Sequence, residues 1–364
     1  MKLFTLLILS LGYLLPSHAQ KSRIIHSNLL NEDRLITIQL PDDYSTNEDS
    51  YGVLYVLDGE YAFDFAAGTV SFLSNTFGHM PPLIVVGIPN IDRLRDVNVR
   101  PNNQNNYAKF LKFIESELMS FVNENYRTNG FDILYGWSSA ADVNFQFLAK
   151  NPNLFDAHIQ SGTGIGPKNA AFLSEELPKH NYKNNYLYVG TEGSDPRAIG
   201  HKKYQNLVVK IAPRNLKYKF ELMDSSSHVD VLGEAIYEGL KFIFNDFYIP
   251  DSVVLQGVTQ IKNYYKSLDQ NYNFQVKIPV GAFSESAGIL FQSRPQEAIN
   301  LLKYGLSIHP TSADLHGSLG EVYEYLDQKE NATIYYQLAY EKSDSNLAAA
   351  MKYKYLSQKF KAEK

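Results

Sequence analysis

The chain has 364 residues, of which 44% are hydrophobic and 20% are charged, and its formal net charge is −5. This composition is ordinary for a globular protein, and the length is sufficient for two domains. The chain contains no cysteine, which excludes disulfides, thiolate metal sites and a lipid anchor on Cys, and it has no Lys/Arg run of the kind that nucleic-acid binding requires.

Residues Met1–Ala19 have the pattern of a signal peptide. Lys2 supplies the positive start, Leu3–Leu15 the apolar segment, and Ser17-His18-Ala19 a small-x-small cleavage signal. The apolar run is too short to span a bilayer, and no second one follows. We therefore expect cleavage after Ala19, export of the mature protein to the periplasm or the exterior, and no membrane span.

The following residues alternate strand-like and helix-like segments. Leu35–Leu40 alternates apolar and polar residues, which predicts a half-buried strand, and the apolar runs Gly52–Leu57 and Leu83–Ile88 predict buried parallel strands. Between Tyr107 and Tyr126 the apolar residues have helical spacing. Strands that alternate with helices predict an α/β fold in which a parallel sheet is covered by helices on both faces.

The segment Gly136-Trp137-Ser138-Ser139-Ala140 follows a strand-like stretch, Phe131–Tyr135, and precedes a helical pattern. Small residues two positions before and after Ser138 are typical of a nucleophile elbow, a turn so tight that larger flanking side chains would collide with the neighbouring strand and helix. Such a turn exposes the serine Oγ at a helix N-terminus, where backbone N–H groups can stabilise an oxyanion. Ala140 replaces the usual Gly of G-x-S-x-G, and an ordinary strand-to-helix turn is the alternative interpretation.

Two further strand-like segments, Tyr186–Val189 and Tyr218–Met223, precede residues that can complete a catalytic triad. Glu192 and Asp195 follow the first segment, and His228 follows the second. The order serine, acid, histidine, with each group just beyond the C-terminal end of a strand, is that of α/β-hydrolases.

We expect Ser138 to be the nucleophile and His228 to be the base that takes its proton. Either Glu192 or Asp195 orients the imidazole. Glu192 is favoured, because Asp195 precedes Pro196, which biases it toward an extended conformation leading away from the sheet.

The expected oxyanion hole consists of two backbone N–H groups, those of Ser139 and of Glu60 in the loop after Asp58-Gly59. Tyr61 and Trp137 are candidates to line the acyl site, although a buried aromatic side chain more often belongs to the core.

The glycine-rich segment Gly162–Gly166 invites a nucleotide-binding interpretation, but it lacks G-x-G-x-x-G spacing and is interrupted by Pro167. It is therefore expected to be a loop after a strand. Since no H-E-x-x-H or Walker motif is present either, we expect neither a cofactor nor a metal.

A closing helix over Leu232–Phe247 and the boundary Ile249-Pro250-Asp251 end a first domain of residues 20–250, which leaves residues 251–364 as an all-α second domain. Its large and small residues recur after about 34 positions, as in tetratricopeptide repeats. The recurring residues are Ala298, Leu302 and Gly305, then Ala332, Tyr336 and Ala339. Two repeats are fewer than a free-standing array needs, so this tail is expected to pack against the first domain, to bind a protein partner, or to self-associate.

With these motifs, the chain resembles the putative esterase family of α/β-hydrolases, which includes esterase D, enterochelin-type siderophore esterases, and feruloyl and acetyl-xylan esterases. The resemblance covers about residues 23–247. It rests on Val53–Gly59, Val85–Asn90 with Arg93 and Asp96, Gly136–Ala140, Asn153–Ala157, and His228 followed by Gly239–Phe244. The chain departs from the family pattern at Trp137, where His is common, and at Ala140.

The resemblance implies an exported serine esterase that hydrolyses a siderophore, feruloyl or carbohydrate ester through an acyl-enzyme on Ser138. It also suggests Glu192 as the acid, because Glu is often found at that position in the family. It does not distinguish among the esters. The alternative is a catalytically weak α/β-hydrolase scaffold that acts as an interaction protein through its helical tail, and the two departures motivate it.

Overall fold

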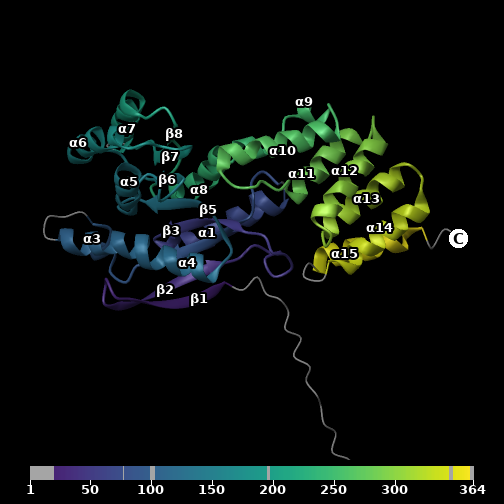
Figure 1. The fold of residues 1–364 in the computed structure, drawn as a ribbon, viewed down its shortest axis with the longest axis horizontal. Coiled ribbons are helices and arrows are strands. Elements are labelled where there is room, and N and C mark those ends of the chain that lie inside the picture. The colour runs from purple at the N-terminus through teal and green to yellow at the C-terminus, as the bar shows by residue number, and fades with distance from the viewer. Residues whose placement is uncertain (1–19, 77, 99–102, 195–196, 344–346, 361–364) are drawn as a thin grey trace, which may run out of the picture.

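The computed structural model describes residues 20–76, 78–98, 103–194, 197–343 and 347–360, so the predicted signal peptide lies outside the described residues. The strands are β1 Lys21–Ser27, β2 Glu32–Gln39, β3 Tyr51–Leu57, β4 Leu83–Ile88, β5 Thr128–Trp137, β6 Ala157–Ser161, β7 Asn185–Glu192 and β8 Leu216–Met223. They form one sheet in the order β1-β2-β4-β3-β5-β6-β7-β8, in which the strands from β4 to β8 are parallel and β1 and β2 are antiparallel. Figure 1 shows helices on both faces of this sheet, and the predicted α/β-hydrolase fold is confirmed.

Both faces of the central strands are buried, which explains their nearly continuous apolar sequences. In β3, Val53 and Tyr55 belong to the core beneath α3 (Gln104–Lys112), α4 (Met119–Asn125) and α5 (Ala140–Lys150). Leu54 and Val56 point to the opposite face, which is covered by α1 (Gly59–Ser71) and α8 (Asp230–Ile243). The helix predicted between Tyr107 and Tyr126 is present, but a π-helical segment, η3 (Phe113–Leu118), joins α3 to α4 within it.

The sheet domain has further helical elements along the chain. They are α2 Arg93–Val97, α6 Pro167–Glu176 and α7 Arg197–Ile211, with the short segments η1 Phe72–Thr76, η4 Leu177–Lys179 and η5 Asn245–Phe247. The glycine-rich segment Gly162–Gly166 lies between β6 and α6, as expected of a loop after a strand. Within the described residues, no helix is long and apolar enough to cross a membrane.

Residues 251–364, here called the helical tail, contain only helices in their described part (Figure 1). These are α9 Asp251–Val254, α10 Val258–Tyr272, α11 Val280–Leu290, α12 Pro295–Ile308, α13 Ala313–Tyr325, α14 Lys329–Glu341 and α15 Leu347–Lys359. All six recurring positions are buried in the tail core: Ala298, Leu302, Gly305, Ala332, Tyr336 and Ala339. The tetratricopeptide character of the tail stays a prediction.

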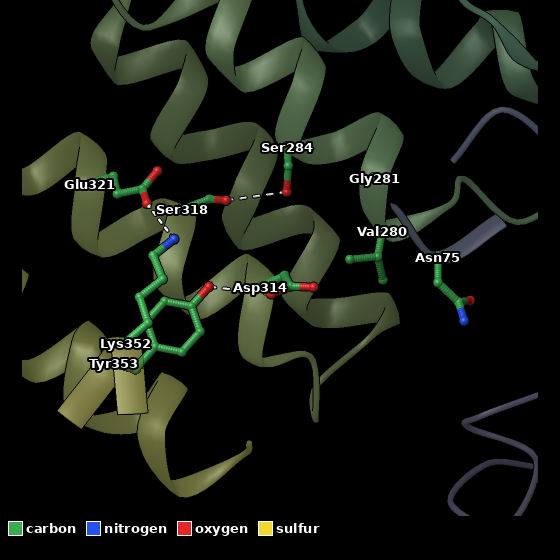
Figure 2. Close-up of a pocket in the computed structure, with 9 residues that line it drawn as sticks. All are labelled: Asn75, Val280, Gly281, Ser284, Asp314, Ser318, Glu321, Lys352 and Tyr353. Atoms are coloured by element: carbon green, nitrogen blue, oxygen red, sulfur yellow. Dashed lines mark hydrogen bonds and ion pairs between the residues drawn. The ribbon is translucent and has the colours of Figure 1, made fainter. Parts of the chain in front are cut away.

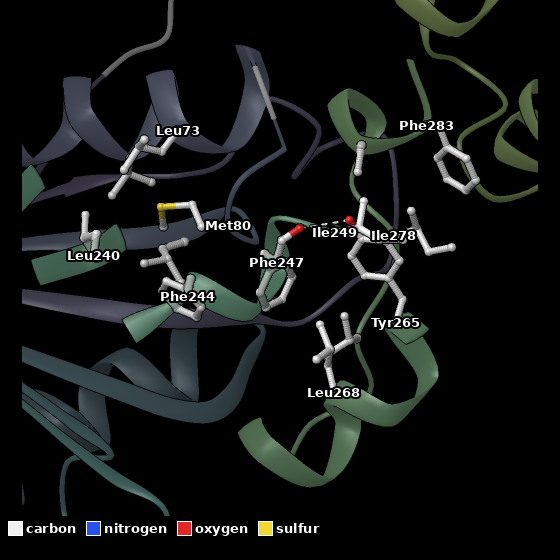
Figure 3. Close-up of a cluster of buried hydrophobic side chains, with 14 of the residues drawn as sticks. Leu73, Met80, Leu240, Phe244, Phe247, Ile249, Tyr265, Leu268, Ile278 and Phe283 are labelled. Atoms are coloured by element: carbon white, nitrogen blue, oxygen red, sulfur yellow. Dashed lines mark hydrogen bonds between the residues drawn. The ribbon is translucent and has the colours of Figure 1, made fainter. Parts of the chain in front are cut away.

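The tail packs against the sheet domain through a continuous apolar core. Figure 3 shows the junction, where Phe244 and Phe247 lie between the sheet domain and the tail residues Tyr265 and Phe283. The Tyr265 hydroxyl donates to the Phe247 carbonyl at 2.9 Å, and the Tyr272 hydroxyl donates to the Ile243 carbonyl at the same distance. The boundary at residue 250 stays a prediction, and the two parts of the chain share one hydrophobic cluster.

Candidate active site

Ser138 occupies a sharp turn between β5 and α5. Its φ is 56°, in the left-handed region that non-glycine residues rarely adopt. Two hydrogen bonds fix this conformation: the Ser138 N–H donates to the Ser161 carbonyl at 2.8 Å, and the Ala141 N–H donates to the Ser138 carbonyl at 3.0 Å. A nucleophile elbow requires a serine that surrounding contacts hold in a strained backbone conformation, and these two hydrogen bonds do so.

The two small residues that flank the turn, Gly136 and Ala140, differ in how large a side chain fits at their positions. A Cβ on Gly136 would lie 2.5 Å from the Ala140 carbonyl oxygen, so no larger residue fits at Gly136 without moving the start of α5. Ala140 is fully buried in the core under α5. The extra methyl at this position is therefore accommodated by packing, and the departure from G-x-S-x-G does not disrupt the turn.

The structure brings three of the predicted site residues into one hydrogen-bonded line. Nε2 of His228 lies 3.1 Å from the Ser138 Oγ, and Nδ1 of His228 lies 2.8 Å from Oε1 of Glu192. Glu192 is the last residue of β7 and is fully buried, whereas Ser138 is only partly buried. Asp195, the other candidate acid, lies outside the described residues.

The charges around His228 favour its neutral form. Burial lowers the pKa of His228, and the positive charges of Arg197 and Arg93 lower it further, while the charge and hydrogen bond of Glu192 act in the opposite direction. An imidazole that stays unprotonated at neutral pH can accept the proton of a serine hydroxyl.

Contacts with Trp137 and Gly162 hold the loop that carries His228. The Trp137 indole N–H donates to the His228 carbonyl at 2.9 Å, and the two rings lie 5.0 Å apart. Gly162 adopts a φ of 59°, and a Cβ there would lie 2.8 Å from the His228 ring. Trp137 therefore supports the histidine loop, and its place at the acyl site stays a prediction.

The two predicted oxyanion donors both lie at helix N-termini. Ser139 is the N-cap of α5, and Glu60 is in the first turn of α1, where backbone N–H groups have no intrahelical acceptor. The residue before α1, Asp58, is fully buried with a φ of 53°, and its carboxylate accepts two hydrogen bonds from Arg93 and one from Asn90. These contacts fix the turn that precedes Glu60, and the role of the Glu60 and Ser139 N–H groups in an oxyanion hole stays a prediction.

Tyr61 is largely exposed, with 63% of its surface accessible, next to this turn. Tyr61 makes a small contribution to the raised pKa of Arg93, whose main cause is the hydrogen bond that the guanidinium donates to Asp58. Its place at the acyl site stays a prediction.

Sequence reasoning missed the contacts that Arg93, Asn90 and Arg197 make beside the site. Arg93 belongs to a motif of the family resemblance, but its contact with Asp58 joins residues 35 positions apart. No local pattern marks Arg197, which donates to Glu192 Oε1 at 2.6 Å.

Two cavities lie elsewhere. Figure 2 shows one of about 200 Å³ between α11, α13, α15 and Asn75. The other, of about 470 Å³, lies beside β8 and α8 and is lined in part by Lys217, Lys219 and Lys241. Neither is lined by Ser138, and among the described residues no group of three or more His, Asp or Glu side chains could hold a metal ion.

The fold and the line of Ser138, His228 and Glu192 are those of a serine hydrolase. Residues 27–227, more than half of the chain, match the family described as "Putative esterase", and the chain belongs to this family. The protein is accordingly a carboxylic ester hydrolase. Among curated proteins, no relative matches the chain.

Solved structures with the same fold include an IroE-like serine hydrolase from Shewanella oneidensis, with 25% identity and a TM-score of 0.65, covering 78% of this chain and 98% of that one. An uncharacterised protein from Capnocytophaga ochracea has 19% identity and a TM-score of 0.63, and covers 93% of this chain and 99% of that one. The siderophore hydrolase EstB from Aspergillus nidulans has 18% identity and a TM-score of 0.52, and covers 64% of this chain and 96% of that one. The similarities to the last two structures show only that the fold is shared.

Proposed function

We propose that the protein is an exported serine esterase that forms an acyl-enzyme on Ser138. The observation that carries the proposal is the line of contacts from Glu192 Oε1 to His228 Nδ1 at 2.8 Å and from His228 Nε2 to Ser138 Oγ at 3.1 Å. A serine hydroxyl is inert at neutral pH unless a base accepts its proton, and this geometry supplies one.

In the acylation step, the Ser138 Oγ attacks the carbonyl carbon of the ester while His228 Nε2 accepts the hydroxyl proton. The C=O π electrons move to the carbonyl oxygen, and the N–H groups of Ser139 and Glu60 donate to the resulting oxyanion. Glu192 accepts from Nδ1–H of His228, which keeps Nε2 as the proton acceptor and stabilises the imidazolium.

When the tetrahedral intermediate collapses, the carbonyl re-forms, the bond to the leaving alkoxide breaks, and His228 gives its proton to that oxygen. Water then attacks the acyl-enzyme, with His228 again as the base. The products are an alcohol, a carboxylic acid and the free Ser138 hydroxyl.

Two further aspects belong to the proposal. The match to the esterase family supports a carboxylic ester as the substrate, with siderophore, feruloyl and carbohydrate esters as the candidates. The signal-peptide pattern of Met1–Ala19 supports export to the periplasm or the exterior.

Hydrolysis of short p-nitrophenyl esters by the purified protein tests the proposal. We expect turnover with the wild type and a loss of about 10⁴-fold or more in Ser138→Ala, as in other serine hydrolases that lose the nucleophile. Ser139→Ala, which removes the neighbouring hydroxyl and keeps the backbone N–H, is the matched control and should stay within a few-fold of wild type. Wild-type turnover in Ser138→Ala would contradict the proposal. The scaffold alternative would be favoured if the wild-type protein hydrolyses no ester in a broad panel and a partner co-purifies with it only when residues 251–364 are present.

A further inference from the structure

Arg197 shares a carboxylate oxygen with the histidine of the site. Its Nη1 donates to Glu192 Oε1 at 2.6 Å, and His228 Nδ1 contacts the same oxygen at 2.8 Å. The second oxygen, Glu192 Oε2, is buried and has no hydrogen-bond partner within the described structure. The orientation of the carboxylate therefore depends on the two groups that meet at Oε1.

The position of Arg197 is set by the packing of α7. Arg197 is the first described residue of that helix. The start of α7 is anchored on both sides: the Ile165 N–H donates to the Gly200 carbonyl at 3.1 Å, and a ring nitrogen of His201 lies 2.9 Å from the Thr191 hydroxyl. Thr191 directly precedes Glu192 in β7, so the helix that carries the guanidinium is joined to the strand that carries the carboxylate.

We propose that Arg197 is a positioning residue that acts through Glu192: it fixes Oε1 of the carboxylate against Nδ1 of His228. This inference rests on the proposed roles of Ser138, His228 and Glu192. Arg197 itself touches neither the ester nor the nucleophile in this role.

The sign of the expected pH effect follows from the charged groups that face His228. Within the part of the chain that the structure describes, these are Glu192 from β7, Arg197 from α7 and Arg93 from α2. Burial lowers the pKa of His228 most, both guanidinium charges lower it further, and Glu192 raises it. Removal of the Arg197 charge therefore raises the pKa of His228. Because only the neutral imidazole accepts the serine proton, the acid limb of the activity profile moves to higher pH.

The test is the pH dependence of kcat/KM for p-nitrophenyl acetate in four proteins: wild type, Arg197→Met, Arg197→Lys and Lys203→Met. Arg197→Met should shift the acid limb upward by about 0.5 to 1 pH unit, the effect of one nearby charge on a partly exposed histidine. Arg197→Lys keeps the positive charge, so the acid limb of this variant should lie close to that of the wild type. Lys203 is an exposed cation on the same helix, and Lys203→Met should leave the limb unmoved.

A double-mutant cycle separates positioning through Glu192 from any independent role. In the wild type, Arg197→Met should also lower the plateau of kcat/KM, because the Glu192 carboxylate loses one of its two contacts. On the Glu192→Gln background the same substitution should lower the plateau by much less, because the carboxylate through which Arg197 acts is already absent. If Arg197→Met leaves the acid limb unchanged, or if the effects of Arg197→Met and Glu192→Gln on kcat/KM are additive, the inference is overturned. These outcomes are distinct from failure of the proposed function, which Ser138→Ala tests independently of Arg197.

Discussion

The carboxyl edge of the sheet and the helical tail differ in what determines their geometry. At the sheet edge, Ser138 and Asp58 adopt left-handed backbone conformations that polar contacts hold in place. In the tail, small residues meet aromatic rings: a Cβ on Gly320 would lie 2.5 Å from the Tyr336 ring. Changes at the first region should therefore act on the reaction, and changes in the second on folding.

The largest expected effect lies at the acid of the site. Glu192→Gln should preserve the fold and lower kcat by up to about 10⁴-fold, because the amide can favour the wrong tautomer of His228. The rates of p-nitrophenyl acetate hydrolysis by Glu192→Gln and Asp195→Asn, with far-UV circular dichroism as the fold control, measure this. Asp195→Asn should stay near wild type. A large loss in Asp195→Asn, with Glu192→Gln near wild type, would transfer the acid role to Asp195.

The next effect concerns the junction of the two regions. Phe247 is almost fully buried and lies against the rings of Phe244, Tyr265 and Tyr272. Phe247→Ala should lower the free energy of unfolding by about 3 to 5 kcal/mol, because it removes aromatic burial and leaves a cavity. Tyr355→Ala, at a tail side chain that is 70% exposed, should change stability by no more than about 0.5 kcal/mol.

Urea unfolding followed by two probes shows whether the regions unfold together. The chain has a single tryptophan, Trp137, whose fluorescence reports on the site, while far-UV circular dichroism reports largely on the helices. One shared core predicts coincident transitions that Phe247→Ala shifts together. Separate transitions would show that the tail unfolds independently of the sheet domain.

The smallest effect concerns the support of the histidine loop. Trp137→Phe keeps an aromatic ring and removes the 2.9 Å hydrogen bond to the His228 carbonyl. One such bond contributes about 1 kcal/mol, so kcat should fall by about 3- to 10-fold with little change in KM. If instead KM rises and kcat is retained, Trp137 lines the acyl site as the sequence suggested.

The sequence was informative where local pattern decides structure. The predicted strand Leu83–Ile88 is β4 with the same bounds, because a short apolar run between turn residues identifies a doubly buried strand. Ser138, Glu192 and His228 are brought together because each follows or ends a strand of one parallel sheet, so their order along the chain implies a common edge. This placement supports their proposed roles.

Other features depend on contacts between distant residues, which periodicity does not encode. β1 was not predicted, because only Ile25 and Ser27 of this edge strand are buried. Trp137 bonds to a carbonyl 91 positions away, so its role in holding the His228 loop could not be read from the elbow motif. The pairing of Arg197 with Glu192 likewise depends on how α7 packs against β7.

The most direct test of the account is to locate the nucleophile chemically. The purified protein is treated with a fluorophosphonate, which forms a stable adduct with an activated serine, and the labelled peptide is identified by mass spectrometry. The account predicts a single adduct on Ser138, absent in Ser138→Ala and much slower to form in Glu192→Gln. Labelling of a different residue, or undiminished labelling of Ser138→Ala, would contradict the account.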